Sequence, residues 1–156
     1  MRNKAKNLTY GAMIAALYVA LSHLQNVLLP GSASAMIQVR VAEALCVFAF
    51  FMPQAIGGLS IGCLLFNLTS GMALPLDAFI GTAATALSAA GMYFLRKCPA
   101  VGFFLPAVCN GVLIGWELSV YIGGGFWLNC GCVALGEVLV LALGIPLYFA
   151  LKKIKW

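Results

Sequence analysis

Four carboxylates and one arginine stand inside or at the edge of long apolar stretches of this sequence. The four are the only acidic residues of the 156-residue chain, and the arginine lies three residues before the first of them. A charged side chain within a bilayer costs roughly 3 kcal/mol or more, and it usually faces a cavity or a partner. These residues therefore predict a polar site inside an apolar protein: Arg40, Glu43, Asp77, Glu117 and Glu137.

The composition of the chain predicts a membrane protein. Hydrophobic residues make up 63% of the chain and charged residues only 8%, whereas about a quarter of the residues of a soluble domain are charged. Most of the six cysteines lie inside apolar runs, so they predict neither a disulfide framework nor a zinc site. We expect a single transmembrane domain covering 1–156, with no metal, no cofactor and no nucleic acid partner.

Breaks at proline, glycine and charge clusters divide the chain into six apolar segments. The second is too short to cross a core of about 30 Å upright, and Pro53 separates it from the third, so we expect a tight hairpin there. An even number of spans puts both termini on one side, which the basic residues identify as cytoplasmic. The expected fold is all-α, with six transmembrane helices near 8–29, 39–52, 54–72, 76–95, 100–121 and 127–151.

This topology brings the polar residues into the outer half of the membrane, with Glu137 near its middle. The inner half has few polar groups, so the pattern indicates a pocket that opens outward and is closed inward. The link at 30–38 is then the expected lid. Because four acids face one arginine, the expected ligand is a cation or a molecule with a cluster of N–H donors. Further candidates for contact with it are Asn67, Asn110 and Trp116.

Several of these residues also have a purely structural interpretation. Arg40 and Glu43 could be an interfacial pair that ends a helix, and Asn67 and Asn110 could join helices by hydrogen bonds. Trp116 could anchor its helix at the membrane interface. Glu117 and Glu137 are harder to explain in this way, because neither has a cation nearby in the sequence.

A strip of small residues on the first span predicts a contact with another protein. Ala12, Ala16 and Ala20 recur every four residues, which lets a second helix approach closely. The chain has no GxxxxGK[ST] phosphate loop, so uphill transport would need energy from a partner or an ion gradient. An intramembrane enzyme is the alternative class, but a single histidine and the lack of metal-ligand spacing argue against it.

The sequence resembles the QueT group of queuosine-precursor transporters, which are substrate-binding S components of energy-coupling factor (ECF) transporters. The stretches that carry the resemblance cover most of the chain. They are "VRVAEALCVFAFFMPQAIGGLSIGCLLFNL", "LDAFIGTAATALSA", "NGVLIGWELSVYIGGGFW" and "GEVLVLALGIPL", together with the small-residue first span.

The resemblance implies a six-helix subunit of the cell membrane that captures a 7-deazaguanine base, such as 7-aminomethyl-7-deazaguanine or queuine. It implies a transmembrane coupling subunit and two cytoplasmic ATPases as partners, with the alanine strip of the first span docking on the coupling subunit. A carboxylate suits the adjacent N–H donors of a guanine-like edge, and Glu117 and Glu137 are the acids assigned to the base. The alternative ligand is another small cationic or vitamin-like molecule.

Overall fold

The computed structural model describes residues 2–33, 37–71 and 73–154, and these residues form helices and connecting loops with no strand among them. The expected all-α fold is therefore confirmed. In chain order the elements are α1 (Arg2–Leu28), the 3-10 helix η1 (Val41–Phe50), α2 (Gln54–Thr69), α3 (Asp77–Phe94), the single turn α4 (Pro99–Gly102), α5 (Leu105–Tyr121) and α6 (Phe126–Leu151).

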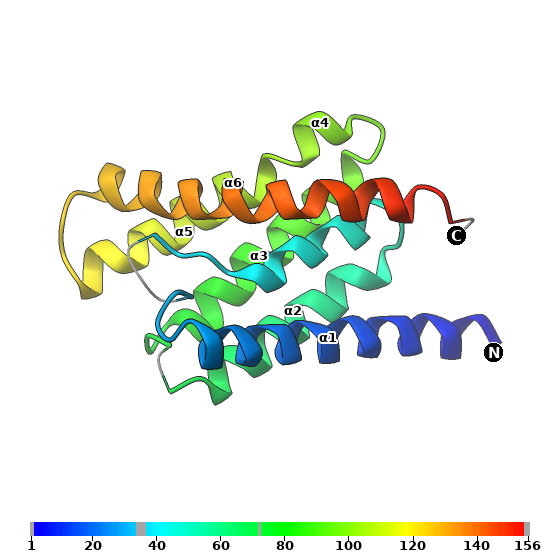
Figure 1. Cartoon of the computed structure of the whole chain (residues 1–156), viewed down its shortest axis with the longest axis horizontal. Helices are drawn as coiled ribbons and strands as arrows, with labels where there is room; N and C mark the ends of the chain where they lie inside the picture. The colour runs from blue at the N-terminus through cyan, green and yellow to red at the C-terminus, as the bar shows by residue number, and fades with distance from the viewer. Residues whose placement is uncertain (1, 34–36, 72, 155–156) are drawn as a thin grey trace.

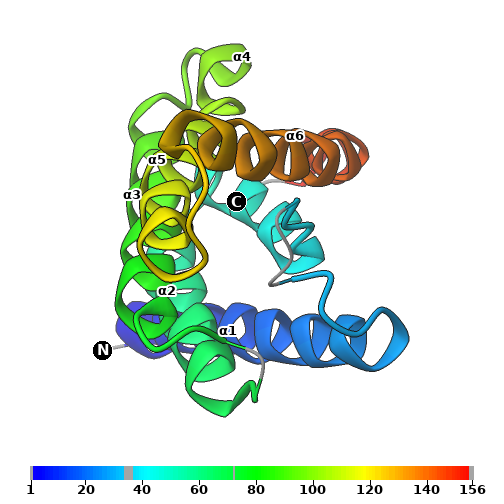
Figure 2. The ribbon, with the colours of Figure 1, turned by 90° about the vertical axis from the view of Figure 1, so that its left-hand side faces the viewer.

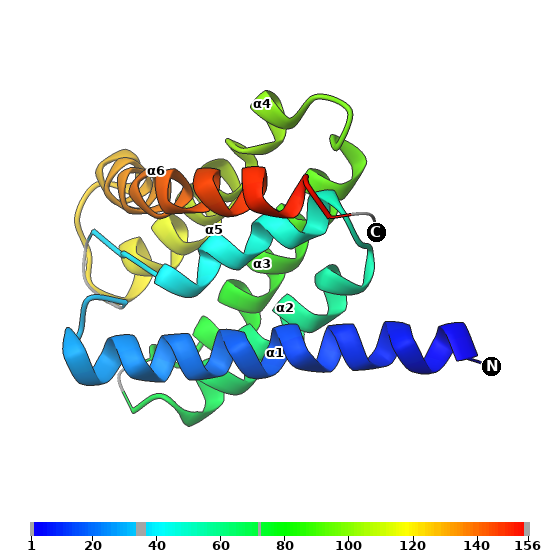
Figure 3. The same ribbon diagram turned by 45° about the vertical axis from the view of Figure 1, so that its right-hand side comes forward.

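The helices form a bundle in which both chain termini lie at the same end (Figure 1). Helix α1 runs along one edge and packs on α2, which packs on α3 (Figure 3). Helix α3 then packs on α5, and α5 on α6. In the end-on view, η1 lies between α1 and α6 (Figure 2), and it contacts α1, α2, α3 and α6.

The 3-10 helix η1 is long for its type, because such helices rarely exceed 3–4 residues. It has ten residues, most of them buried. A 3-10 helix rises about 2.0 Å per residue, so ten residues extend about 20 Å, where an α-helix would extend about 15 Å. Residues 51–53 alone separate η1 from α2, in keeping with the expected hairpin at Pro53. One narrow, mostly buried element thus leads from Arg40 to the turn before α2.

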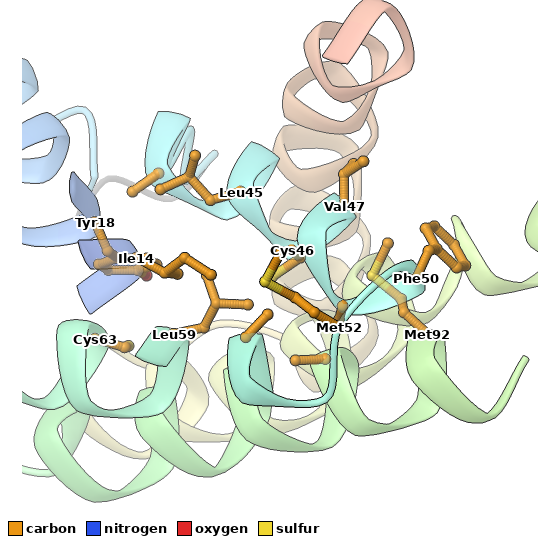
Figure 4. Close-up of a cluster of buried hydrophobic side chains, with 14 of the residues drawn as sticks. Ile14, Tyr18, Leu45, Cys46, Val47, Phe50, Met52, Leu59, Cys63 and Met92 are labelled. Carbon is orange, nitrogen blue, oxygen red and sulfur yellow. The ribbon is translucent and has the colours of Figure 1, made fainter. Parts of the chain in front are cut away.

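Among the described residues, the larger of two apolar clusters lies between α1, η1, α2 and α3, and the smaller one belongs to α5 and α6 and comprises Ile114, Leu118 and Val133. Figure 4 shows side chains of the larger cluster. At the C-terminal end of η1, the ring of Phe50 lies 5.3 Å from that of Phe103 and 5.6 Å from that of Tyr148, measured between ring centroids. This end of the bundle is therefore closed by aromatic side chains.

Glycines let the helices approach closely at several contacts. A Cβ added to Gly58 of α2 would lie 2.5 Å from the carbonyl oxygen of Gly11 on α1, and one added to Gly62 would lie 2.7 Å from Tyr18 Cβ. Between α5 and α6, a Cβ on Gly115 would lie 2.8 Å from Cys130 Cα. These distances are too short for any side chain, so the small residues determine how closely the helices pack.

By length and apolar composition, three helical segments among the described residues are able to cross a membrane: Lys4–Leu28, Pro99–Tyr121 and Phe126–Leu151. The other helices are shorter or less apolar, so six spans remain a prediction. The segment predicted at 100–121 is divided by residues 103–104, because α4 ends at Gly102 and α5 begins at Leu105. Residues 34–36 of the predicted lid lie outside the described residues, and the lid also remains a prediction.

The close packing of α1 and α2 predicts that Gly58→Ala lowers the stability of the protein. The added methyl would meet backbone atoms of Gly11, which have no room to move, and overpacking of this kind costs about 1–3 kcal/mol. Thermal unfolding in detergent measures the change. Gly57→Ala is the matched control, because a Cβ there meets nothing within 4 Å. Equal melting temperatures for the two variants would contradict the packing argument.

Candidate functional site

A buried ion pair joins the start of η1 to the start of α3. Arg40 Nη2 donates to Asp77 Oδ1 at 3.2 Å, and the two side chains are only 5% and 1% exposed. Arg40 Nε also donates to the carbonyl oxygen of Ala33 at 3.2 Å. Asp77 Oδ2 accepts the backbone N–H of Leu74 at 2.9 Å, and Asn67 Nδ2 donates to the Asp77 carbonyl at 2.8 Å. The pair is therefore held from both sides.

Glu43 is buried completely and is bonded by protein donors. Its Oε1 accepts from the hydroxyl of Tyr18 at 2.6 Å and from that of Thr85 at 2.8 Å, and Cys46 Sγ donates to its Oε2 at 3.1 Å. Tyr18 belongs to α1 and Thr85 to α3. Glu43 thus ties η1 to the helices on either side, and both of its oxygens already accept hydrogen bonds.

Glu117, Glu137 and Asn110 are buried as well, but their polar atoms are largely unsatisfied. Within the described part of the chain, both carboxylate oxygens of Glu117, both amide atoms of Asn110 and Glu137 Oε2 have no hydrogen-bond partner. Asn110 and Glu117 lie seven residues apart on α5 and so share one face. A buried polar atom without a partner costs about 1–3 kcal/mol. Such atoms indicate a site for a ligand.

Two of the unsatisfied groups, both acids, lie close enough to Arg40 for its charge to act on them. Its guanidinium acts electrostatically on both Glu117 and Glu137; Asp77 also acts on Glu117, and Glu43 on Glu137. Arg40 Nη1 and Asn67 Oδ1 are further buried atoms for which the described residues provide no partner. We group these buried side chains from α2, α5, α6 and the start of η1 as the acceptor cluster, with Asn110 included because it shares a face of α5 with Glu117: Arg40, Asn67, Asn110, Glu117 and Glu137.

The acceptor cluster has more free acceptors than free donors. Counted over the described residues, the acceptors are five oxygens: two on Glu117 and one each on Glu137, Asn110 and Asn67. The donors are two nitrogens, Arg40 Nη1 and Asn110 Nδ2. Since carboxylates can only accept hydrogen bonds when ionised, the matching ligand is rich in N–H donors and carries at least one acceptor. A positive charge on the ligand would also suit the excess of acids over arginine.

A glycine makes room beside this cluster. A Cβ added to Gly81 of α3 would lie 2.9 Å from Asn67 Nδ2 and 3.2 Å from Arg40 Nη1. Helix α3 therefore presents bare backbone to these two side chains. Gly136, next to Glu137, likewise packs directly on the backbone of Gln38, which is itself buried.

Two of the predicted groups of residues lie away from the acceptor cluster. The side chain of Trp116 is 50% exposed although Glu117 beside it is buried. Ala12, Ala16 and Ala20 lie on the exposed face of α1, where with Gly57 and other residues of α1 and α2 they line an open apolar groove of about 780 Å³. The groove and the cluster are thus separate features of the molecule.

The opposite face of α1 holds three buried polar residues that the sequence reasoning did not select as site residues. Tyr18, Ser22 and Gln25 follow one another at spacings of four and three residues, which places them on a single helical face. That spacing is a usable signal, because polar side chains on one face of an apolar helix usually point into the protein. Thr85 on α3 gave no such signal, since it stands among small residues.

An all-helical protein with long apolar helices and an enclosed polar cluster has the features of a membrane transport protein. Comparison with family models gives a match to the QueT transporter family over residues 8–153, nearly the whole chain. The chain belongs to the QueT transporter family. Comparison with curated proteins and with solved structures gave no match.

The hydrogen bonds of Glu43 predict that Tyr18→Phe destabilises the protein. The substitution keeps the ring but removes one donor from a buried carboxylate, which costs about 1–3 kcal/mol. Thermal unfolding measures the loss, and Tyr121→Phe is the control because Tyr121 is exposed. A melting temperature unchanged by Tyr18→Phe would show that Glu43 does not depend on this bond.

Proposed function

We propose that this chain is the substrate-binding S component of an ECF transporter and that it takes up a queuosine precursor of the 7-deazaguanine class. Membership of the QueT transporter family supports uptake of such a precursor. The observation that carries the proposal is the acceptor cluster, whose free oxygens outnumber its free donors. A 7-deazaguanine base offers ring and exocyclic N–H donors on one edge and a carbonyl acceptor beside them.

The free atoms suggest a role for each residue of the cluster. Glu117, with both oxygens free, suits the two adjacent N–H groups of the guanine-like edge, because a carboxylate can accept both at once. Arg40 Nη1 suits the carbonyl oxygen of the base. Glu137 is then available for a cationic aminomethyl arm, and Asn67 and Asn110 complete the contacts. Asp77 and Glu43 hold Arg40 and η1 in place, and Trp116 lies at the periphery.

The same cluster would also suit another small cation with several N–H groups. This is the second candidate function, and the excess of acceptors favours it equally well. A panel of ligands therefore decides between the two. In either case the ligand leaves the protein chemically unchanged, since QueT proteins are transporters.

We further propose six spans with both termini in the cytoplasm. In support, the termini lie at one end of the bundle (Figure 1), and the exposed Lys4, Lys6, Lys152 and Lys153 lie near them. Basic residues of this kind favour the cytoplasmic side. The acceptor cluster begins at the opposite end, where η1 and α3 start, so the ligand would enter from outside.

The groove between α1 and α2 is the proposed docking surface for the transmembrane coupling subunit. Its lining is almost wholly small or apolar, which suits a helix within the membrane. The energy for uptake would come from the two ATPases bound to that subunit. Because none of the residues that line the groove belongs to the acceptor cluster, ligand binding and partner docking should be separable by substitution.

For ligand binding, we expect Glu117→Gln and Glu137→Gln each to weaken the affinity by more than about tenfold, because bonds to charged groups contribute at least that much. Titration calorimetry of the purified protein with 7-aminomethyl-7-deazaguanine and with the neutral 7-cyano analogue measures both effects. Wild type should prefer the cationic base. Glu137→Gln should reduce that preference, whereas Glu117→Gln should weaken both ligands alike.

Unfolding temperatures of the two variants serve as the control for an intact fold. Mass spectrometry of the ligand that co-purifies identifies it and checks that it is unmodified. Wild-type affinity for both bases in both variants would exclude these acids from the site. Binding of other small cations in preference to deazaguanines would favour the second candidate function.

For partner docking, we expect Ala16→Leu to bind ligand normally when purified alone but to fail in uptake. A leucine would hold a partner helix away from the groove by the width of a side chain. Uptake of labelled base by cells that also contain the coupling subunit and ATPases is the measurement. Ala83→Leu is the matched control, because Ala83 is an exposed alanine of α3 that does not line the groove. Wild-type uptake by Ala16→Leu would mean that the partner docks elsewhere.

A further inference from the structure

Gln25 is a buried polar residue near the end of α1, and it lies on the same face as Tyr18. It is only 6% exposed, although α1 is an edge helix. None of the roles assigned above to the acceptor cluster involves Gln25. Its hydrogen bonds nevertheless reach the residues on either side of Arg40, Val39 and Val41.

The side-chain amide of Gln25 holds both arms of the link between α1 and η1. Its Nε2 donates to Ser32 Oγ at 2.8 Å, on the arm that leaves α1, and to the carbonyl oxygen of Val39, on the arm that enters η1. Its Oε1 accepts the backbone N–H of Val41 at 2.8 Å. The two arms are also joined directly, because Val39 N–H donates to the Ser32 carbonyl at 3.0 Å.

The bond to Val41 supplies what η1 lacks at its own N-terminus. The first amides of a helix have no partner within it, and the side chain of the N-cap residue, Arg40, makes no capping bond. Gln25, from another helix, satisfies the first amide of η1. The residues on both sides of Arg40 are therefore fixed by one side chain.

This arrangement determines where the guanidinium of Arg40 points. With Val39 and Val41 held, Nε reaches Ala33 and Nη2 reaches Asp77. Nη1 is left facing the bare backbone of Gly81, next to the amide of Asn67. It is the only guanidinium nitrogen for which the described residues offer no hydrogen-bond acceptor, and so it is the nitrogen available to a ligand.

We propose that Gln25 is a positioning residue for substrate binding: by holding the backbone on both sides of Arg40, it directs Nη1 into the acceptor cluster. This inference rests on the proposed function. It assigns Gln25 no contact with the ligand, so its effect should be transmitted through Arg40.

The first test needs no ligand. Hydrogen–deuterium exchange of the peptide that contains Val39 to Val41 should be several-fold faster in Gln25→Met, which keeps the length of the side chain but loses all three bonds. Gln25→Glu keeps an acceptor for the Val41 amide and should exchange more slowly than Gln25→Met. Asn26→Leu is the matched control, because Asn26 Nδ2 donates to Ser70, beyond the end of α2. Exchange unchanged by Gln25→Met would overturn the proposal.

The second test measures affinity for 7-aminomethyl-7-deazaguanine in a double-mutant cycle. Gln25→Met should weaken binding about tenfold, because the hydrogen bond from the charged Arg40 to the ligand would be lost. Gln25→Glu should weaken binding less. In an Arg40→Lys background, Gln25→Met should have little further effect, because the nitrogen that it directs is absent. An equal loss in both backgrounds would overturn the proposal.

The outcomes separate this inference from the proposed function. If the wild type binds neither deazaguanine base, the proposed function fails, whatever the exchange rates are. If the wild type binds the base and Gln25→Met binds it equally well, Gln25 has no positioning role and the proposed function stands. If Arg40→Lys binds too weakly for the cycle, the affinities of the single variants are compared instead. The proposal requires Gln25→Met to bind the base most weakly, Gln25→Glu more tightly and Asn26→Leu most tightly of the three, and any other order overturns it.

Discussion

A guanidinium enclosed in an apolar bundle must be neutralised and hydrogen-bonded, and the end of the bundle where η1 and α3 begin is arranged around that requirement for Arg40. The partner carboxylate belongs to Asp77, the first residue of α3, and it accepts a hydrogen bond from the backbone N–H of Leu74. A buried ion pair gains little net stability compared with apolar residues of similar size. The presence of the pair is therefore better explained by the proposed role of Arg40 in ligand binding. One nitrogen of the guanidinium remains available, and the structure around it maintains that arrangement.

The four acids of the chain divide into two kinds according to their hydrogen bonds. Asp77 and Glu43 are satisfied by protein donors and join η1 to α1 and α3. Glu117 accepts no hydrogen bond from a donor among the described residues, since its neighbour Asp77 is another acid, and Glu137 has at least one free oxygen. Acidic residues in similarly apolar surroundings therefore differ in whether their oxygens accept hydrogen bonds from the protein. The difference depends on which donors the neighbouring helices supply.

The sequence was sufficient for the all-α fold, the approximate helix positions and the set of buried acids, because apolar periodicity and the cost of a buried charge are local properties. It could not assign the partners of these acids. Nothing in the apolar first span indicates that Tyr18 bonds to Glu43, 25 residues away, since helix packing alone brings them together. The ten-residue 3-10 helix was also beyond prediction, because it depends on tertiary contacts with α1, α2, α3 and α6.

The form of η1 constrains the length of this segment more strictly than its composition. With three residues per turn, side chains three positions apart stand in line, so Glu43 and Cys46 share one edge of η1 and are bonded to each other. An inserted or deleted residue would turn everything on one side of it by about 120° relative to the other. Arg40 would then lose its alignment with Asp77 even if every side chain were retained. Homologous segments should therefore vary in sequence far more readily than in residue number.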